Sequence, residues 1–188
     1  INDLPSTSEL AFGLMLSLLR NITISFDNVK EGNWNYEPYI GHQVKGLTIG
    51  IIGYGRLGKI MKRLFSGWDV EVLLDDPYVA CNKVDKEYLI MNSDVIFLHV
   101  HVTEETKGMV DEVFLSKMKK NSYLINTSRG ELVDEDLIIK SIQDGVLKGY
   151  GTDVIRDEFG DQKNSKLVEF SKSHNVVITP HVGGMTIE

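Results

Sequence analysis

Three polar side chains that could take part in acid–base and anion-binding chemistry each come just after a short apolar run. They are Arg129, Asp153 and His181. A guanidinium binds a carboxylate through two parallel hydrogen bonds, and an imidazole exchanges protons near neutral pH. If the runs are parallel strands, their carboxyl ends meet at the sheet edge where ligands bind. The sequence therefore predicts an Arg, an Asp and a His at one edge, although each alone also has an ordinary structural explanation.

A glycine-rich turn follows the first of these runs. Its sequence is G-x-G-x-x-G, with glycines at Gly53, Gly55 and Gly58, and with Arg56 and Leu57 between the last two. The first glycine permits a tight turn, the second lets the backbone approach a pyrophosphate, and the third allows close helix–strand packing. The helix that begins here directs free N–H groups and its positive dipole end toward phosphates. Because the turn follows a strand and opens a helix, it predicts a dinucleotide site.

The second predicted strand ends at two adjacent carboxylates, Asp75 and Asp76. An acidic residue about 20 positions beyond the glycines binds the ribose hydroxyls and repels a 2′-phosphate, which favours NAD over NADP. We assign this role to Asp76, because it directly precedes Pro77, where the strand must end. Asp75 stays open as the alternative.

The elements that must position these residues alternate in a regular way from residue 47 onward. Short apolar runs, several of them rich in Val and Ile, alternate with amphipathic segments. This alternation is typical of an α/β fold with a doubly wound parallel sheet of the Rossmann type. The expected strands are 47–52, 70–74, 95–98, 123–125, 149–152 and 176–178, and the expected helices are 57–65, 111–118, 134–141 and 165–170.

A mostly buried helix is expected before this sheet. Ser6 and Glu9 match a capping box at its start, and Leu10, Leu14, Leu18 and Ile22 then recur at helical spacing, so the helix is expected to reach Ile22. The following segment, 27–45, contains glycine, proline and mixed polar residues. It is expected to form an irregular arm.

Composition and charge limit the partners. Lys and Arg number 20 and Asp and Glu number 27, which gives a net charge of −7 and argues against nucleic acid as a partner. The longest apolar stretch, 10–19, is shorter than the ~20 residues of a membrane-spanning helix. A single cysteine, Cys81, fits a reducing compartment such as the cytoplasm. His99 and His101 would face one side if the strand before them continued, but without an evident third ligand they predict no metal site.

Four motifs together resemble the D-isomer-specific 2-hydroxyacid dehydrogenases, a family that includes phosphoglycerate, glycerate, D-lactate and formate dehydrogenases. The resemblance runs from about Ser6 to the last residue. Its strongest parts are the glycine turn with the strand before it and the segment 126–135, and the pair 153–154 and the segment 179–184 complete it. It implies NAD as the cofactor and hydride transfer between NAD(H) and a D-2-hydroxy acid/2-oxo acid pair.

The resemblance also implies roles for individual residues. Arg129 looks like the arginine that holds the substrate carboxylate, and His181 looks like the acid/base that exchanges a proton with the 2-hydroxyl. Glu158 looks like the carboxylate that hydrogen-bonds this histidine, and Asp153 like the residue that holds the nicotinamide carboxamide. Further contacts to the cofactor are implied for Val100, Thr127, Ser128, Gly183 and Gly184.

Two positions depart from the family pattern. The family usually has proline after the catalytic glutamate, whereas Phe159 follows Glu158 here. Asp157 is adjacent, so it is the alternative partner of His181. His101 stands where family members often have proline, which makes the loop near the nicotinamide unusual.

The domain organisation is also implied by the resemblance. Residues 1–45 are expected to form an interdomain helix and a dimerisation arm, and 46–188 the NAD-binding domain, with most of the substrate domain missing from this chain. We therefore expect a homodimer, and expect the fragment alone to be inactive. An NAD-sensing module like the C-terminal-binding-protein corepressors, or a phosphite or formate dehydrogenase, is the alternative.

Overall fold

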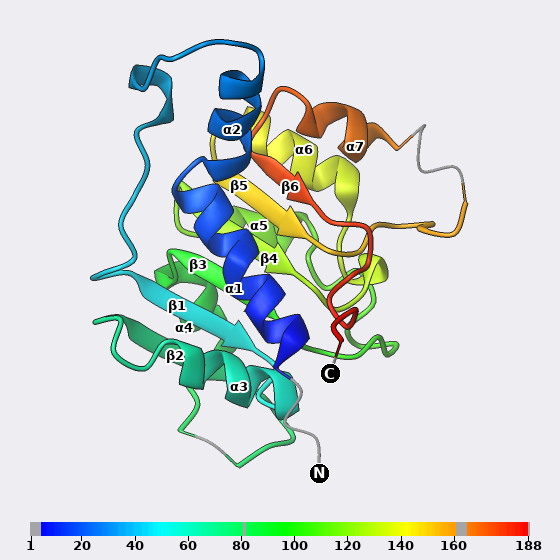
Figure 1. The fold of residues 1–188 in the computed structure, drawn as a ribbon. Coiled ribbons are helices and arrows are strands. Elements are labelled where there is room, and N and C mark those ends of the chain that lie inside the picture. The colour runs from blue at the N-terminus through cyan, green and yellow to red at the C-terminus, as the bar shows by residue number, and fades with distance from the viewer. Residues whose placement is uncertain (1–4, 81, 161–164, 188) are drawn as a thin grey trace.

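A six-stranded parallel sheet forms the centre of the fold (Figure 1). The structure is a computed structural model that describes residues 5–80, 82–160 and 165–187, so Cys81 lies outside the described residues. The sheet order β2-β1-β3-β4-β5-β6 confirms the predicted doubly wound architecture. From β1 the chain forms β2 at one edge, then crosses back past β1 to β3 and continues to β6 at the other edge. The strands are β1 Thr48–Ile52, β2 Glu71–Asp75, β3 Val95–Leu98, β4 Ser122–Asn126, β5 Leu147–Thr152 and β6 Val176–Ile178.

Helices cover both faces of the sheet, and alternate strand residues therefore enter two separate cores. Along β3, Val95 and Phe97 pack on one face, and Ile96 and Leu98 pack on the other. This two-sided burial explains the continuous apolar runs of the sequence. One face carries α1 Ser6–Leu19 and α3 Arg56–Leu64, and the other carries α4 Lys86–Asn92, α5 Glu112–Lys117, α6 Glu135–Gln143 and α7 Lys166–Ser171.

The first helix differs from its prediction at both ends. Its N-cap is Pro5 and no side chain caps it, so the predicted capping box at Ser6 is wrong. Helix α1 ends at Leu19, because Asn21 takes a left-handed conformation with φ 53° before the next helix begins. The buried stripe is as expected, and α1 crosses the sheet face in Figure 1.

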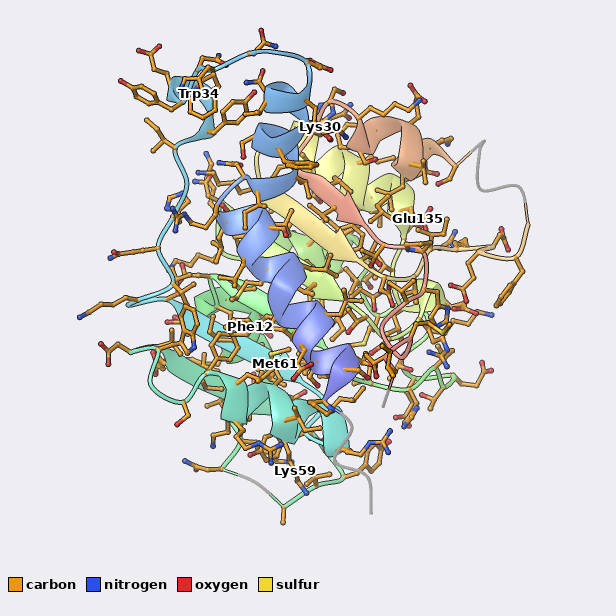
Figure 2. The ribbon with its side chains drawn as sticks, in the orientation of Figure 1. Phe12, Lys30, Trp34, Lys59, Met61 and Glu135 are labelled. Carbon is orange, nitrogen blue, oxygen red and sulfur yellow. The ribbon has the colours of Figure 1, made fainter. Side chains whose placement is uncertain are left out.

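The predicted irregular arm is partly helical. Helix α2 covers Ile22–Lys30, and a single 3₁₀ turn, η1, covers Glu37–Tyr39. Trp34 lies between them on the arm and is 89% exposed (Figure 2). The arm therefore presents apolar side chains to solvent that the domain core does not use.

Within the described part of the chain, no single helix has the length and apolar character to cross a membrane. Helices α1 and α2 meet those criteria only as a pair bent by 66°. The apolar stripe of α1 is already packed in the core of this domain.

Candidate functional site

The glycine turn between β1 and α3 has two crowded positions and one open position. Gly53 has φ +94°, and a Cβ there would overlap the carbonyl oxygen of His99. A Cβ at Gly58 would overlap the carbonyl oxygen of Gly53. Gly55, the N-cap of α3, has open space around its Cβ position. The two crowded glycines hold the tight turn, and the open one leaves room for a group above the helix N-terminus.

Asp76 lies against this turn. Its Oδ2 accepts a hydrogen bond from the Tyr54 N–H at 2.7 Å, and its Oδ1 accepts from the Tyr78 and Val79 N–H groups at 2.8 and 3.1 Å. Burial opposes ionisation, but the three backbone N–H groups lower the pKa of Asp76 below its ordinary value. Asp76 is therefore a carboxylate held ionised beside the glycine turn.

Asp75 lies in a different environment. Burial raises the pKa of Asp75, an effect that Lys86 at 3.9 Å partly opposes. Its Oδ2 is buried and has no hydrogen-bond partner among the described residues. Of the two adjacent carboxylates, the structure therefore places Asp76 against the turn and directs Asp75 elsewhere.

A buried amide organises the loop that carries Arg129. Asn126, at the end of β4, is fully buried, accepts from the Ser128 N–H at 3.1 Å and donates to the Arg129 carbonyl at 2.9 Å. The Ser128 hydroxyl donates to the Leu98 carbonyl at 2.8 Å, and thus ties the loop to β3. The Arg129 side chain is exposed, and its Nη1 donates to the Ser128 carbonyl. The ordering role of Asn126 was not predicted from the sequence.

The neighbouring Thr127 is also buried. Its hydroxyl oxygen has no hydrogen-bond partner among the described residues. A buried hydroxyl without a partner at a strand end leaves hydrogen-bonding capacity for a bound group.

A second buried side chain, Asp153, organises the turn that carries His181. One carboxylate oxygen of Asp153 accepts from the Thr179 hydroxyl at 2.5 Å and from the Val182 N–H at 2.9 Å. The other oxygen accepts from the Gly183 N–H at 2.7 Å. Asp153 is 2% exposed, so it acts as an internal clamp on this turn. Its sequence position predicted a ligand-facing group, and this structural role was missed.

The clamp holds His181 in an uncommon backbone conformation. His181 has φ +54°, and its N–H donates to the carbonyls of Asp153 and Thr179 at 2.9 and 3.0 Å. Such left-handed conformations are uncommon outside glycine and persist where the surroundings fix them. The side-chain direction of His181 is therefore set by the turn.

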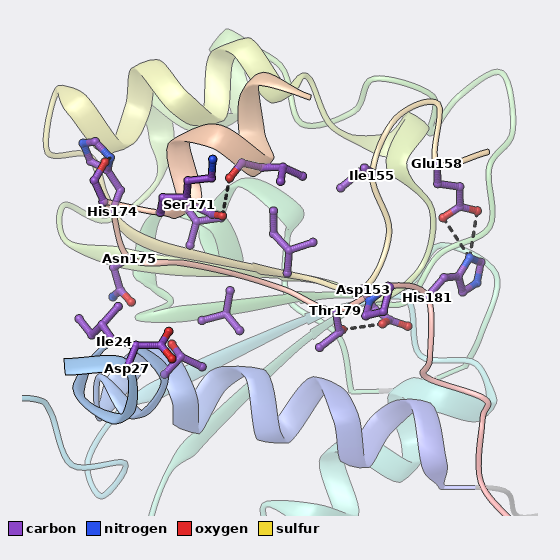
Figure 3. A pocket seen from close by; sticks show the side chains of 18 of the residues that line it. Ile24, Asp27, Asp153, Ile155, Glu158, Ser171, His174, Asn175, Thr179 and His181 are labelled. Atoms are coloured by element: carbon purple, nitrogen blue, oxygen red, sulfur yellow. Dashed lines mark hydrogen bonds and ion pairs between the residues drawn. The ribbon is translucent and has the colours of Figure 1, made fainter. Parts of the chain in front are cut away.

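The imidazole of His181 pairs with Glu158. Its Nδ1 lies 2.9 and 3.0 Å from the two Glu158 carboxylate oxygens (Figure 3). An ionised carboxylate can only accept a hydrogen bond, so Nδ1 is the donor in this pair. The other ring nitrogen, Nε2, faces away from Glu158 and is available for another partner. The Glu158 side chain is 19% exposed and that of His181 is 43% exposed. The alternative residue, Asp157, sits at a left-handed position with φ 55°, and its carbonyl accepts from Gly160.

A cavity of about 1010 Å³ opens beside this pair. Asp153, Glu158 and His181 line one end of it, and residues from α2, α7, β6 and the loop between α7 and β6, including Asp27 and His174, line the rest (Figure 3). The cavity joins segments far apart in the sequence. The cavity could therefore not be predicted from the spacing of residues in the sequence.

The two histidines after β3 do not share a strand face. The strand ends at Leu98, so the alternation that would place His99 and His101 together does not apply. The His99 ring nitrogens are buried without hydrogen-bond partners among the described residues, and its ring stacks 6.1 Å from Phe97. His101 is exposed. Across the described ranges, no group of three or more His, Cys, Asp or Glu could hold a metal ion.

The family model described as "D-isomer specific 2-hydroxyacid dehydrogenase, NAD binding domain" matches residues 12–183. The chain belongs to this family. The tight glycine turn, the open space at Gly55 and the ionised Asp76 fit the NAD that this domain binds.

Known members of the family cover nearly the whole chain. A glycerate dehydrogenase from Methylorubrum extorquens is 38% identical over 93% of this chain and 57% of its own length. A glyoxylate reductase from Thermococcus litoralis is 35% identical over 97% of the chain and 58% of its own length. A crystal structure of D-lactate dehydrogenase from Aquifex aeolicus complexed with NAD and lactic acid has a TM-score of 0.89 and 33% identity. It is matched over 97% of this chain and 60% of that one. The chain thus spans somewhat more than half the length of these relatives.

Proposed function

We propose that this chain is the cofactor-binding part of an NAD-dependent dehydrogenase that acts on a D-2-hydroxy acid/2-oxo acid pair. The observation that carries the proposal is the His181–Glu158 pair at the carboxyl edge of an NAD-binding sheet. An imidazole whose Nδ1 is held by a carboxylate has its other nitrogen available to give or take a proton.

The proposed cofactor site begins at the glycine turn. The open position at Gly55 and the Arg56 and Leu57 N–H groups at the start of α3 would hold the pyrophosphate, and Gly53 and Gly58 keep the turn tight. The adenosine ribose hydroxyls hydrogen-bond the ionised Asp76 carboxylate. Asp153 already accepts three hydrogen bonds from the histidine turn, and its remaining lone pair would accept one from the nicotinamide carboxamide. The remaining contacts are proposed for Val100, Thr127, Ser128, Gly183 and Gly184.

The chain's own groups handle the substrate and the proton. When bound, the nicotinamide supplies or accepts the hydride. Arg129 binds the substrate carboxylate through its guanidinium fork, which orients the 2-oxo group. His181 donates a proton from Nε2 to the ketone oxygen, or accepts one from the 2-hydroxyl. Glu158 accepts a hydrogen bond from Nδ1 and so holds the ring with Nε2 facing away from the carboxylate.

The proposed domain organisation follows from the length comparison. Residues 1–45 form an interdomain helix and arm, and 46–188 form the NAD-binding domain. The relatives are longer, so we assign most of the substrate domain to the part of their length that this chain does not match. The purified 188-residue chain should then bind NADH but show almost no turnover, because closure between two domains would be missing. Robust dehydrogenase activity from this chain alone would contradict this organisation.

The decisive experiment uses the full-length enzyme with a panel of 2-oxo acids, followed by NADH absorbance. Turnover of at least one 2-oxo acid, lost in His181→Ala, is the expected result. Turnover of phosphite or formate alone would replace the proposed substrate class. Tight NADH binding with no turnover across the panel would favour a sensing module like the corepressor relatives.

The cofactor site can be tested separately with two glycine variants. Gly55→Ala adds a methyl group to open space at φ −71°, so the fold should keep its stability while NADH affinity falls at least tenfold. Gly13→Ala, which adds a methyl group to open space at an exposed position of α1 outside the proposed cofactor site, is the control. Unchanged NADH affinity in Gly55→Ala would place the pyrophosphate elsewhere.

A homodimer through the arm is also proposed. Helix α2 and the following arm expose large apolar side chains, and Trp34, Tyr36 and Ile40 are 89%, 81% and 79% exposed. Such clusters mark protein interfaces. Trp34→Ser with Ile40→Ser should convert a dimer to monomer in sedimentation, whereas Val113→Ser, at an exposed site on α5, should not. We also propose a cytoplasmic location, which the single cysteine supports.

A further inference from the structure

A side-chain hydrogen bond joins the loops that follow β2 and β3. The hydroxyl of Tyr78 donates to Oε2 of Glu105 at 2.8 Å, across 27 positions of sequence. The ring of Tyr78 is itself 81% exposed. This hydrogen bond raises the pKa of Tyr78, as expected for a phenol that donates to a carboxylate. An aromatic ring that the core does not use is thus tied at its tip to another loop.

Both ends of this connection rest on ordered backbone. On the β2 side, Asp76 accepts from the Tyr78 and Val79 N–H groups, which fixes the start of the loop. On the β3 side, the Thr106 hydroxyl donates to the His101 carbonyl at 2.6 Å and accepts from the Thr103 N–H at 2.8 Å. Glu105 therefore projects from a closed turn. Hydrogen bonds within each loop therefore fix the two residues, Tyr78 and Glu105, that connect the loops.

The sheet order places these loops on either side of the glycine turn. Strand β1, which carries the turn, lies between β2 and β3. Asp76, the proposed ribose ligand, sits in the same loop as Tyr78, two residues before it. An adenine whose ribose is held by Asp76 would therefore lie close to both loops. Val102, in the loop after β3, is 37% exposed and adds an apolar side chain to that loop.

We propose that Tyr78 and Glu105 form a strap that sets the width of an adenine slot, with the Tyr78 ring as one wall. The inference rests on the proposed ribose position at Asp76. Tyr78 contacts the base by stacking, which is favourable for any purine. Glu105 is a positioning residue, because it acts only by holding the Tyr78 ring. A slot fixed before binding reduces the ordering that the cofactor must otherwise impose, and so tightens binding.

The test compares NADH with reduced nicotinamide mononucleotide, which lacks the adenosine half. Dissociation constants for both are measured by nicotinamide fluorescence on the protein and its variants. Tyr78→Phe keeps the ring and removes the hydroxyl, and Glu105→Ala removes the acceptor. Each should weaken NADH binding by about three- to tenfold, and the double variant should lose no more than either single one. Glu105→Gln, which keeps an oxygen acceptor, should restore affinity to within about twofold.

The mononucleotide separates the strap from a general loss of structure. Its affinity should be the same in all variants, since nothing that binds the nicotinamide end is altered. An equal loss for both ligands, additive losses in the double variant, or unchanged NADH affinity in the single variants would overturn the strap. Asp76 also holds the loop that carries Tyr78, so the ribose position is tested by the preference for NADH over NADPH, which Asp76→Ala should reduce and the strap variants should leave unchanged. If Asp76→Ala reduces this preference and the strap variants do not weaken NADH binding, the strap alone is wrong. If neither effect is seen, the ribose placement and the strap both fail.

Discussion

Replacing His99 with phenylalanine should remove a pH-dependent weakness of the folded protein. Burial lowers the pKa of His99 from 6.5 to about 4, and among the described residues its ring nitrogens have no hydrogen-bond partner that would stabilise the imidazolium. The unfolded chain therefore binds the proton more readily than the folded chain. The free energy of unfolding falls as pH falls through this window, and full stability returns above about pH 6.5. Phenylalanine keeps the stacking on Phe97 and removes the titration.

The size of the effect follows from the two pKa values. Each unit of pKa difference corresponds to about 1.4 kcal/mol. When the pH falls from about 7 to about 5, His99 becomes protonated in the unfolded chain but stays neutral in the folded chain. Its titration should therefore lower the free energy of unfolding by about 2 kcal/mol over this range. All other titrating groups are common to the two proteins. The difference between wild type and His99→Phe therefore isolates this one residue.

Urea unfolding followed by circular dichroism at about pH 7, 6 and 5 measures the effect. The free energy of unfolding should fall more steeply with acidification in wild type than in His99→Phe. The control is His101→Phe, the same substitution at an exposed site, which should keep the wild-type pH dependence. Parallel pH profiles for wild type and His99→Phe would show that the buried ring finds a partner or solvent, and would refute the reasoning.

Three further outcomes are expected from side chains of the site. Asp153→Ala leaves three donors of the histidine turn without an acceptor and should lower the free energy of unfolding by about 3 kcal/mol, measured in urea. In the full-length enzyme, His181→Ala should lower kcat by at least about 100-fold while the Kd for NAD changes no more than a few-fold, since its role is proton transfer. Asp76→Ala should weaken NAD and reduce the preference over NADP in paired titrations. Unchanged NAD affinity there would transfer the ribose role to Asp75.

The sheet was predictable from sequence because its strands are buried on both faces. Runs such as 95–98 contain only apolar residues. Aspartates such as Asp111 and Asp134 cap the N-termini of helices and so mark where those helices begin. Helix α4 was missed because it has only seven residues, although its Asp85 cap was visible in the sequence. The break after α1 depends on a left-handed Asn21, a conformation that the apolar spacing does not encode.

The candidate site was predictable as residue types but not as contacts. Asp76 and His181 could be selected as candidates because each follows directly after a predicted strand, and such a position can be read from the sequence alone. The clamp of Asp153 on the histidine turn depends on packing between β5 and the segment after β6, which is 26 to 30 residues away. The choice of Glu158 over Asp157 required the backbone conformation of the connecting loop.

The first turn of α1 touches two parts of the site at once. The Thr7 hydroxyl donates to the Gly183 carbonyl at 3.1 Å, and the buried Ser8 hydroxyl donates to the Leu57 carbonyl at 3.1 Å. One contact is in the turn that carries His181, and the other is in the first turn of α3, beside the glycines. A movement of the start of α1 would therefore disturb both the turn that carries His181 and the first turn of α3. The two adjacent residues Thr7 and Ser8 thus couple the position of the His181 turn to that of the glycine turn, although neither residue lies in either turn.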